Sequence, residues 1–303
     1  MSHIKENIIQ PAWNLIANDS RIKKFYFIPG LLSIIFLTLL LVYQFVYTYV
    51  VIFKQQEKAL EVILNFFHSA YVTEVLITGA IFLLLYIVII PVFEGGLISY
   101  IDKKNHDSMD NSYDFVGAGL YRFLPMFEYS NSTSQFKIIS LLNLYLFSIR
   151  FTGLEYIALD NVIFIILLVI GIIINIMFSY SKYIIVLENK KAMESMGKST
   201  KITILNITTT IKLYFWMFIL NLRVVINFLV FLLFPVLFAF AITYITSKIF
   251  LVVSIIALSI LFGGFILFLG YLTAVLDVFT TAIWYYAYIT GKEKVKDGDD
   301  DQD

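Results

Sequence analysis

Six long runs of apolar residues constrain this chain more than any other feature. A membrane core about 30 Å thick is crossed by about 20 helical residues, and only helices and closed barrels satisfy the backbone hydrogen bonds in lipid. Barrel strands alternate polar and apolar residues, whereas these runs are continuous. Hydrophobic residues make up 60% of the chain and charged residues 15%, against about a quarter charged in soluble domains. We therefore expect an all-α polytopic membrane protein with six transmembrane helices.

The expected spans lie at about 29–53, 75–93, 138–159, 162–180, 224–245 and 249–271, within one helical domain of residues 1–290. The third span is the least regular, because it contains Arg150 and Glu155. The apolar segment 249–290 is about 63 Å long at 1.5 Å per residue, roughly twice one crossing. We therefore expect a break near Gly263–Gly264 or Gly270. Residues 291–303 form a charged tail, which we expect to be disordered.

Lysine and arginine are concentrated on one side of the predicted membrane. Six spans place the amino terminus, the second and fourth loops and the tail on the same side, which holds 17 of the 22 basic residues. The opposite side holds Lys54, Lys58 and Lys248. Because basic residues mark the cytoplasmic side, we expect both termini in the cytoplasm and a location in the cytoplasmic (inner) membrane. The first span is too long for a signal peptide and no small-residue cleavage site follows it, so we expect it to be retained.

The segments outside the spans predict amphipathic helices at the cytoplasmic interface. Residues 4–16, 113–127 and 198–222 combine apolar and basic side chains. Two interpretations are open: their apolar faces enter the acyl boundary of the membrane, or they pack on the spans. Near the end of the chain, Trp284, Tyr285, Tyr286 and Tyr288 are typical of the aromatic belt found at membrane interfaces.

A short pattern recurs after the second and fourth spans. A glutamate follows each span, Glu94 or Glu188, and the sequence acid-Ser-Met-x-x-Ser then begins at Asp107 and at Glu194. Either chance or an ancient hairpin repeat accounts for it. The segment 183–188 with Ala192 and Ser199, and the Gly95–Gly96 pair with its following loop, resemble an uncharacterised family of six-helix bacterial membrane proteins. This family includes YciC and the membrane domain associated with glycerophosphodiester phosphodiesterases. The resemblance implies a six-helix topology and no phosphodiesterase activity, because the catalytic domain of the fused members is absent.

The sequence contains no motif that predicts catalysis or metal binding. It has no cysteine, and its three histidines belong to different segments. Neither H-E-x-x-H nor G-x-S-x-G occurs. We therefore expect no catalytic residues, no metal ligands and no cofactor. The 22 basic and 22 acidic residues balance, so we also expect no nucleic-acid partner.

Polar residues in or beside the spans are the candidate functional residues, because a charge at the membrane centre costs about 2.5–3.5 kcal/mol on insertion scales. Arg150 lies about 18 Å along the third helix, either in a polar cleft, as a buried clamp or reaching towards the outer interface. Arg223 and Asp277 are expected at the inner interface, where they can pair. The remaining candidates are the intramembrane residues Glu155, Asn143 and Asn227 and the interfacial acids Glu94 and Glu188. Asparagines within spans, including Asn175, are expected to join helices by hydrogen bonds.

Three functions are compatible with these features. The first is a non-enzymatic scaffold, assembly partner or lipid-associated accessory protein, which fits the predicted interfacial helices and the few deep charges. The second is a transporter or channel for a small solute or lipid, favoured by Arg150 and by Pro235, which we expect to kink the fifth span. The third is an intramembrane lipid enzyme that uses Glu94, Asp102 or Asp107. The expected partners are membrane lipids and either a second copy of the chain or another membrane protein.

Overall fold

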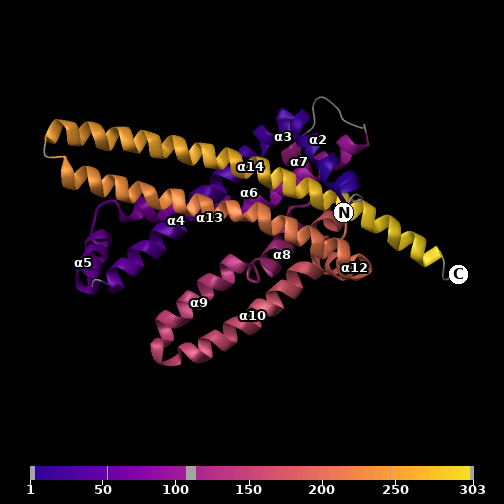
Figure 1. The fold of residues 1–303 in the computed structure, drawn as a ribbon, viewed down its shortest axis with the longest axis horizontal. Helices are drawn as coiled ribbons and strands as arrows, with labels where there is room; N and C mark the ends of the chain where they lie inside the picture. Colours follow the sequence, from indigo (N-terminus) through magenta and orange to yellow (C-terminus); the bar gives the residue numbers. More distant parts are fainter. Residues whose placement is uncertain (1–3, 53, 107–113, 246, 301–303) are drawn as a thin grey trace. The chain divides into compact units, whose positions relative to one another are not determined.

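A computed structural model describes residues 4–52, 54–106, 114–245 and 247–300 (Figure 1). The structure is 91% helical, with no strand among these residues, so the all-α prediction is confirmed. The helices are η1 (Lys5–Ile9), α2 (Gln10–Asn18), α3 (Ser20–Phe25), α4 (Phe27–Ile52), α5 (Gln56–Phe67), α6 (Val72–Asn105), α7 (Phe115–Tyr121), α8 (Phe123–Ser134), α9 (Ile138–Thr152), η2 (Leu154–Tyr156), α10 (Ile157–Met177), α11 (Ser181–Glu188), α12 (Ala192–Leu205), α13 (Ile207–Tyr244) and α14 (Lys248–Asp300).

Within the described residues, four helical segments are long and apolar enough to cross a membrane: Ser20–Val51, Val72–Asn105, Ile157–Glu188 and Lys248–Lys294. A fifth arises if Ala192–Leu205 and Ile207–Leu220, which meet at 99°, form one bent span. Apolar side chains cover these helices, and Ile165, Val169 and Ile173 of α10 are each at least half exposed. Apolar faces of this extent are typical of helices that contact lipid. The fold is therefore of the membrane type, and the count of six spans stays a prediction.

The chain divides into two compact units. The first unit comprises Met1–Asp19, Pro91–Asn221 and Val278–Asp303, and the second comprises Ser20–Ile90 and Leu222–Asp277. Nothing in the sequence predicts this division, because three of its four boundaries fall inside the long helices α6, α13 and α14, and the fourth lies between α2 and α3. In α6 the boundary coincides with Pro91, the one proline inside that helix. Proline lacks the backbone N–H that would bond to the preceding turn, so it weakens a helix locally.

In the second unit, α4 packs closely on the first part of α14. A Cβ atom added to Gly30 would lie 2.6 Å from the carbonyl oxygen of Gly270, so the two backbones approach directly. The break expected near Gly263–Gly264 or Gly270 is absent, and α14 continues through all three glycines. Within lipid no water competes for the backbone hydrogen bonds, so glycine does not end the helix, and Gly270 instead permits this close packing.

The predicted third and fourth spans form a helical hairpin, α9 and α10, in the first unit (Figure 1). Helix α9 ends at Thr152 rather than at the expected residue 159, because Gly153 adopts φ +83°, a conformation that glycine reaches at little cost. The 3₁₀ turn η2 follows, and α10 begins at Ile157 instead of residue 162. At 1.5 Å per residue, the 15 residues of α9 extend about 22 Å, which is shorter than the hydrocarbon core of a typical membrane.

The core of the first unit is rich in aromatic side chains from α11, α13 and α14. Tyr180 and Tyr214 each pack edge-on against Trp284, with ring centroids 5.7 and 5.1 Å apart. Tyr183 stacks on Tyr288 and donates a hydrogen bond to the carbonyl oxygen of Thr281 at 3.0 Å. The aromatic-belt prediction is therefore wrong for Trp284, Tyr285 and Tyr288, which are buried in protein. The hydroxyls of Tyr285 and Tyr288 donate to Asp102 of α6 and Glu188 of α11, which a sequence pattern does not reveal.

The predicted interfacial segments are helical and pack in part on the protein. Helix α12 contacts α8, α10 and α11 and buries residues that include Ser195, Met196 and Ile202. Its other face carries exposed apolar side chains such as Met193 and Leu205. For α12 the packing on the protein is therefore confirmed for one face, and entry of its exposed apolar side chains into the membrane stays a prediction.

The charged segment after residue 290 also differs from the expectation. It continues α14 as helix to Asp300, and residues 301–303 lie outside the described chain. Its first residues are attached to the unit, because Asn206 donates to the Gly291 carbonyl at 3.3 Å and Lys292 pairs with Glu188 at 2.8 Å. These contacts extend the helical register beyond the apolar part of the sequence.

Candidate functional site

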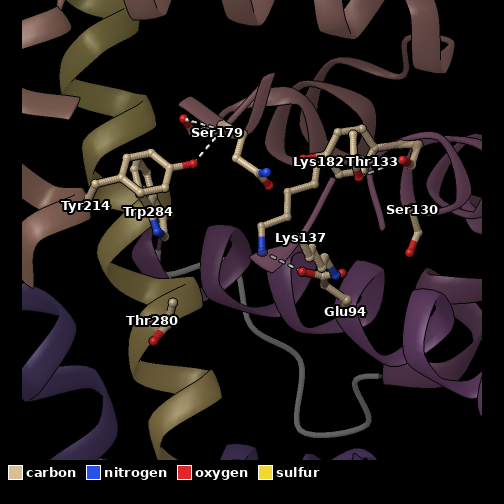
Figure 2. A pocket seen from close by; sticks show the side chains of 11 residues that line it. Glu94, Ser130, Thr133, Lys137, Ser179, Lys182, Tyr214, Thr280 and Trp284 are labelled. Carbon is tan, nitrogen blue, oxygen red and sulfur yellow. Dashed lines mark hydrogen bonds and ion pairs between the residues drawn. The ribbon is translucent and has the colours of Figure 1, made fainter. Parts of the chain in front are cut away.

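A polar cavity of about 170 Å³ lies within the first unit (Figure 2). Three charged residues line it, one from α6, one from the residue before α9 and one from α11: Glu94, Lys137 and Lys182. The other lining residues carry hydroxyl, amide or indole groups and come from α8, α10, α13, α14 and the residues after α10: Tyr129, Ser130, Thr133, Asn175, Ser179, Tyr214, Thr280 and Trp284. The cavity therefore has a net charge of one positive unit at neutral pH.

Glu94 and Lys182 form an ion pair across the cavity. The Lys182 Nζ lies 2.5 Å from the Glu94 Oε1, and their side chains are 18% and 23% exposed. Figure 2 shows the two side chains extended towards each other from α11 and α6. Removing one partner of such a partly buried pair destabilises the fold, because the other charge is left without its counter-charge. Glu94 was predicted as an interfacial acid, and this lysine is its partner.

Several polar groups of the cavity are already bonded to backbone carbonyls. Asn175 Nδ2 donates to the carbonyl of Phe136 at 2.9 Å, so this asparagine joins α10 to the turn between α8 and α9 rather than to another helix. Tyr129 donates to the Phe178 carbonyl at 3.0 Å, and Tyr214 donates to the Asn175 carbonyl. Burial raises the pKa of Tyr129 well above that of a free phenol, so it stays protonated.

Four groups of the lining are left with hydrogen-bonding capacity. Within the described residues, the side chains of Lys137, Ser130, Thr280 and Trp284 make no hydrogen bond or ion pair with another protein group. The lysine ammonium and the tryptophan indole can only donate hydrogen bonds, and the two hydroxyls can donate as well as accept. The hydrogen-bonding groups of the cavity that have no protein partner are therefore mainly donors.

The second predicted interfacial acid, Glu188, joins three elements outside the cavity. Its Oε1 accepts from the Tyr288 hydroxyl at 2.6 Å and pairs with Lys292 at 2.8 Å, both in α14, while its Oε2 pairs with Lys198 of α12. The side chain is 11% exposed. This carboxylate therefore holds α11, α12 and α14 together.

A third carboxylate, Asp19, was not predicted from the sequence. It lies buried after α2 and accepts a hydrogen bond from the Tyr100 hydroxyl at 2.5 Å. It also pairs with Lys104, which lies one turn further along α6. Together these contacts join the amino-terminal helices to α6.

The intramembrane candidates of the third span lie along α9 and in the turn that follows it. Arg150 is half-buried in the last turn of α9, and Glu155 is exposed in η2. Asn143 donates to the carbonyl of Ile139 in its own helix at 2.9 Å. The sequence did not single out Asp160, which is buried in α10 and accepts from Ser148 and Thr152 at 2.7 Å each. These candidates do not line the cavity.

The remaining candidates lie in the second unit. Arg223 and Asn227 belong to α13, but their side chains are outside the described ones, as is the predicted Asp107. Asp277 is half-buried in α14. The predicted pairing of Arg223 with Asp277 therefore stays a prediction. Among the described residues, no group of three or more His, Cys, Asp or Glu side chains is placed to hold a metal ion.

Two functional candidates, Lys137 and Lys182, were counted in the sequence only as cytoplasmic charges. Lys137 precedes the third predicted span and Lys182 follows the fourth, so the antiparallel hairpin brings both lysines to the same end. Glu94 follows the second predicted span at the same predicted membrane face. The positions of charges directly beside the spans were thus the available signal for this cavity.

No protein-family model matches the chain, and neither a curated protein nor a solved structure matches it. The resemblance to the six-helix bacterial family therefore stays a prediction.

Proposed function

We propose that this chain is a non-enzymatic integral membrane protein that acts as a lipid-associated accessory or scaffold. The observation that carries the proposal is the use of its carboxylates to connect elements. Asp19, Glu94 and Glu188 each pair with a lysine of another element. Charges engaged in this way stabilise one arrangement of helices, which is what a protein that presents a fixed surface to lipids or partners requires.

The proposal includes a topology and a family. Three pairs of helices support six spans: α4 with α6, α9 with α10, and α13 with α14. With six spans, both termini face the cytoplasm and the protein lies in the cytoplasmic membrane, as in the resembling bacterial family that includes YciC. The basic residues beside the spans, Lys137 and Lys182 among them, favour this orientation.

Gentle extraction tests the accessory or scaffold function. The full chain is extracted in a mild neutral detergent and examined by native mass spectrometry and size-exclusion chromatography with light scattering. We expect a second copy, another membrane protein or retained phospholipid to accompany the chain. A monodisperse monomer that carries neither lipid nor partner would contradict the proposal.

The half-buried Arg150 in the last turn of α9 favours a second candidate function, transport of a small solute or lipid. Transport predicts flux through liposomes that contain the purified chain, and a fall in flux when Arg150→Ala leaves the folded protein intact. The matched control is Arg122→Ala, which removes an arginine at the start of α8. Flux no higher than in empty liposomes, measured with the folded wild-type chain, would reject this candidate.

A further inference from the structure

The chemistry of the cavity is asymmetric. Most of its polar groups already bond to backbone carbonyls or, in the case of Lys182, to Glu94. The groups left over among the described residues are those of Lys137, Ser130, Thr280 and Trp284. A ligand that satisfies them must offer several acceptor atoms, because each of the four can donate and two of them can only donate.

The charge of the cavity points to the same kind of ligand. Glu94 pairs with Lys182 at 2.5 Å and also attracts Lys137, so one carboxylate faces two lysines and the cavity keeps one net positive charge. No carboxylate of the described chain lies within ion-pair distance of Lys137. The backbone of Lys137 is fixed at the start of α9, because its carbonyl accepts a hydrogen bond from the Leu141 N–H at 3.0 Å.

The cavity lies where apolar helices become polar. Glu94 follows the apolar part of α6, Lys137 precedes α9, and Asn175 and Ser179 lie at and after the end of α10. In a membrane, such positions fall at the level of the lipid headgroups. Trp284 adds an indole N–H, which can only donate, to the lining of the cavity.

We propose that this cavity is a binding site for a phosphate group, with Lys137 as its cation and Ser130, Thr280 and Trp284 as hydrogen-bond donors. The volume of about 170 Å³ exceeds several times the roughly 30 Å³ that one water molecule occupies, which leaves room for a tetrahedral oxyanion. Glu94 holds Lys182 in an ion pair at the edge of this site. The phosphate belongs either to the headgroup of an anionic phospholipid or to a soluble phosphate compound. This inference goes beyond the proposed function, which requires no particular ligand.

Two binding measurements on the full chain test the site and distinguish its source of phosphate. In a neutral detergent, inorganic phosphate and glycerol 3-phosphate are titrated into the protein by isothermal calorimetry. In parallel, the protein is reconstituted in phosphatidylcholine nanodiscs with or without phosphatidylglycerol, and the retained lipids are counted by native mass spectrometry.

The informative variant is Lys137→Gln, and its matched control is Lys191→Gln. Both lysines are exposed, both directly precede a helix, and both have an extended backbone, with φ −69° and ψ 144° or 158°. We expect Lys137→Gln to weaken binding about tenfold or more, because hydrogen bonds to charged groups contribute that much. Lys191→Gln should bind like the wild type, and Lys137→Arg should retain most of the affinity.

Each outcome is decisive. If the wild type retains phosphatidylglycerol, does not bind the soluble compounds, and loses the lipid in the variant Lys137→Gln, the ligand is a lipid headgroup. If the wild type binds a soluble compound and Lys137→Gln does not, the ligand is a soluble phosphate. Equal binding by wild type and Lys137→Gln overturns the site. If Lys137→Gln and Lys191→Gln weaken binding equally, the site is also overturned, because the lysines then attract anions without specificity. If none of the probes binds to folded wild-type protein, the site is also overturned. If Lys137→Gln retains lipids or partners to the same extent as the wild type, the accessory function is supported and the phosphate site is rejected.

Discussion

Single carboxylates hold the helices of the first unit together, and Glu188 contacts three side chains of two other helices. Its carboxylate accepts from Tyr288 and pairs with Lys198 and Lys292. In the variant Glu188→Gln, both lysines lose their counter-charge while the shape of the side chain is kept. Because a partner of a charged hydrogen bond contributes about 1.5–3 kcal/mol, we expect a loss of stability of that order. Thermal unfolding of the purified chain in detergent measures it as a lower Tm.

The matched control for this prediction is Glu194→Gln. Glu194 pairs with Lys190 at 2.5 Å in the same part of the chain, but its side chain is 54% exposed. Solvent screens such pairs, so their removal usually has little effect. Similar values of Tm for both variants would show that the Glu188 contacts do not stabilise the fold.

The sequence predicted some residue roles and missed others for a physical reason. Asn175 was expected to join helices, and it bonds instead to Phe136 in the turn between α8 and α9, because an amide in an apolar span has few other partners. Glu94 and Glu188 were expected as interfacial acids, but their lysine partners were not predicted. Those lysines lie 88 residues beyond Glu94 and 10 residues beyond Glu188, and only the packing of helices brings them together.

At the scale of elements, the crossing of α6 and α7 depends on two glycines. A Cβ atom added to Gly96 would collide with the backbone oxygen of Phe115, and one added to Gly119 would collide with that of Val92. Backbone atoms cannot move aside as a flexible side chain can. Because forced overpacking costs about 1–3 kcal/mol, we expect Gly96→Ala to lower the Tm and to loosen α7.

The same helix offers a control at Gly79. A Cβ atom there has nothing within 4 Å, and alanine is favoured over glycine inside a helix by up to about 1 kcal/mol. Gly79→Ala should therefore leave the Tm unchanged or raise it. Limited proteolysis around residue 115 provides the second measurement. Equal thermal and proteolytic stability of Gly96→Ala and wild type would contradict the close crossing.

The existence of helices was easier to predict than their ends. The apolar runs gave helices at each expected span, yet the glycines had different consequences. Gly153 turns the chain with φ +83° and ends α9, whereas Gly263 and Gly264 lie within a continuous α14. A glycine permits a turn without requiring it, and the surrounding packing decides. The same reasoning applies to the tail, where contacts of Gly291 and Lys292 continue a helix that composition did not predict.

At the scale of the whole molecule, composition was sufficient to predict an all-α protein of the membrane type, because continuous apolar runs have few other solutions. The number of membrane crossings depends on α9, which is the shortest of the six helices expected to span the membrane. With 15 residues, this helix spans about 22 Å, so it crosses only if Arg150 and the residues before it reach the interfaces or the membrane is locally thin.

Labelling of single cysteines tests the six-span topology directly, because the natural chain has no cysteine that would react in the background. Glu155→Cys places a thiol at the exposed tip of the α9–α10 hairpin, while Met193→Cys and Asn18→Cys place one at exposed positions on the predicted cytoplasmic side. With a membrane-impermeant maleimide, we expect residue 155 to be labelled in spheroplasts, and residues 193 and 18 only after permeabilisation. If residue 155 also requires permeabilisation, the α9–α10 hairpin does not cross the membrane. The cavity beside Lys137 would then no longer lie at the foot of a membrane-spanning hairpin. Labelling of residue 18 in intact spheroplasts would instead reverse the amino-terminal orientation that the distribution of basic residues predicts.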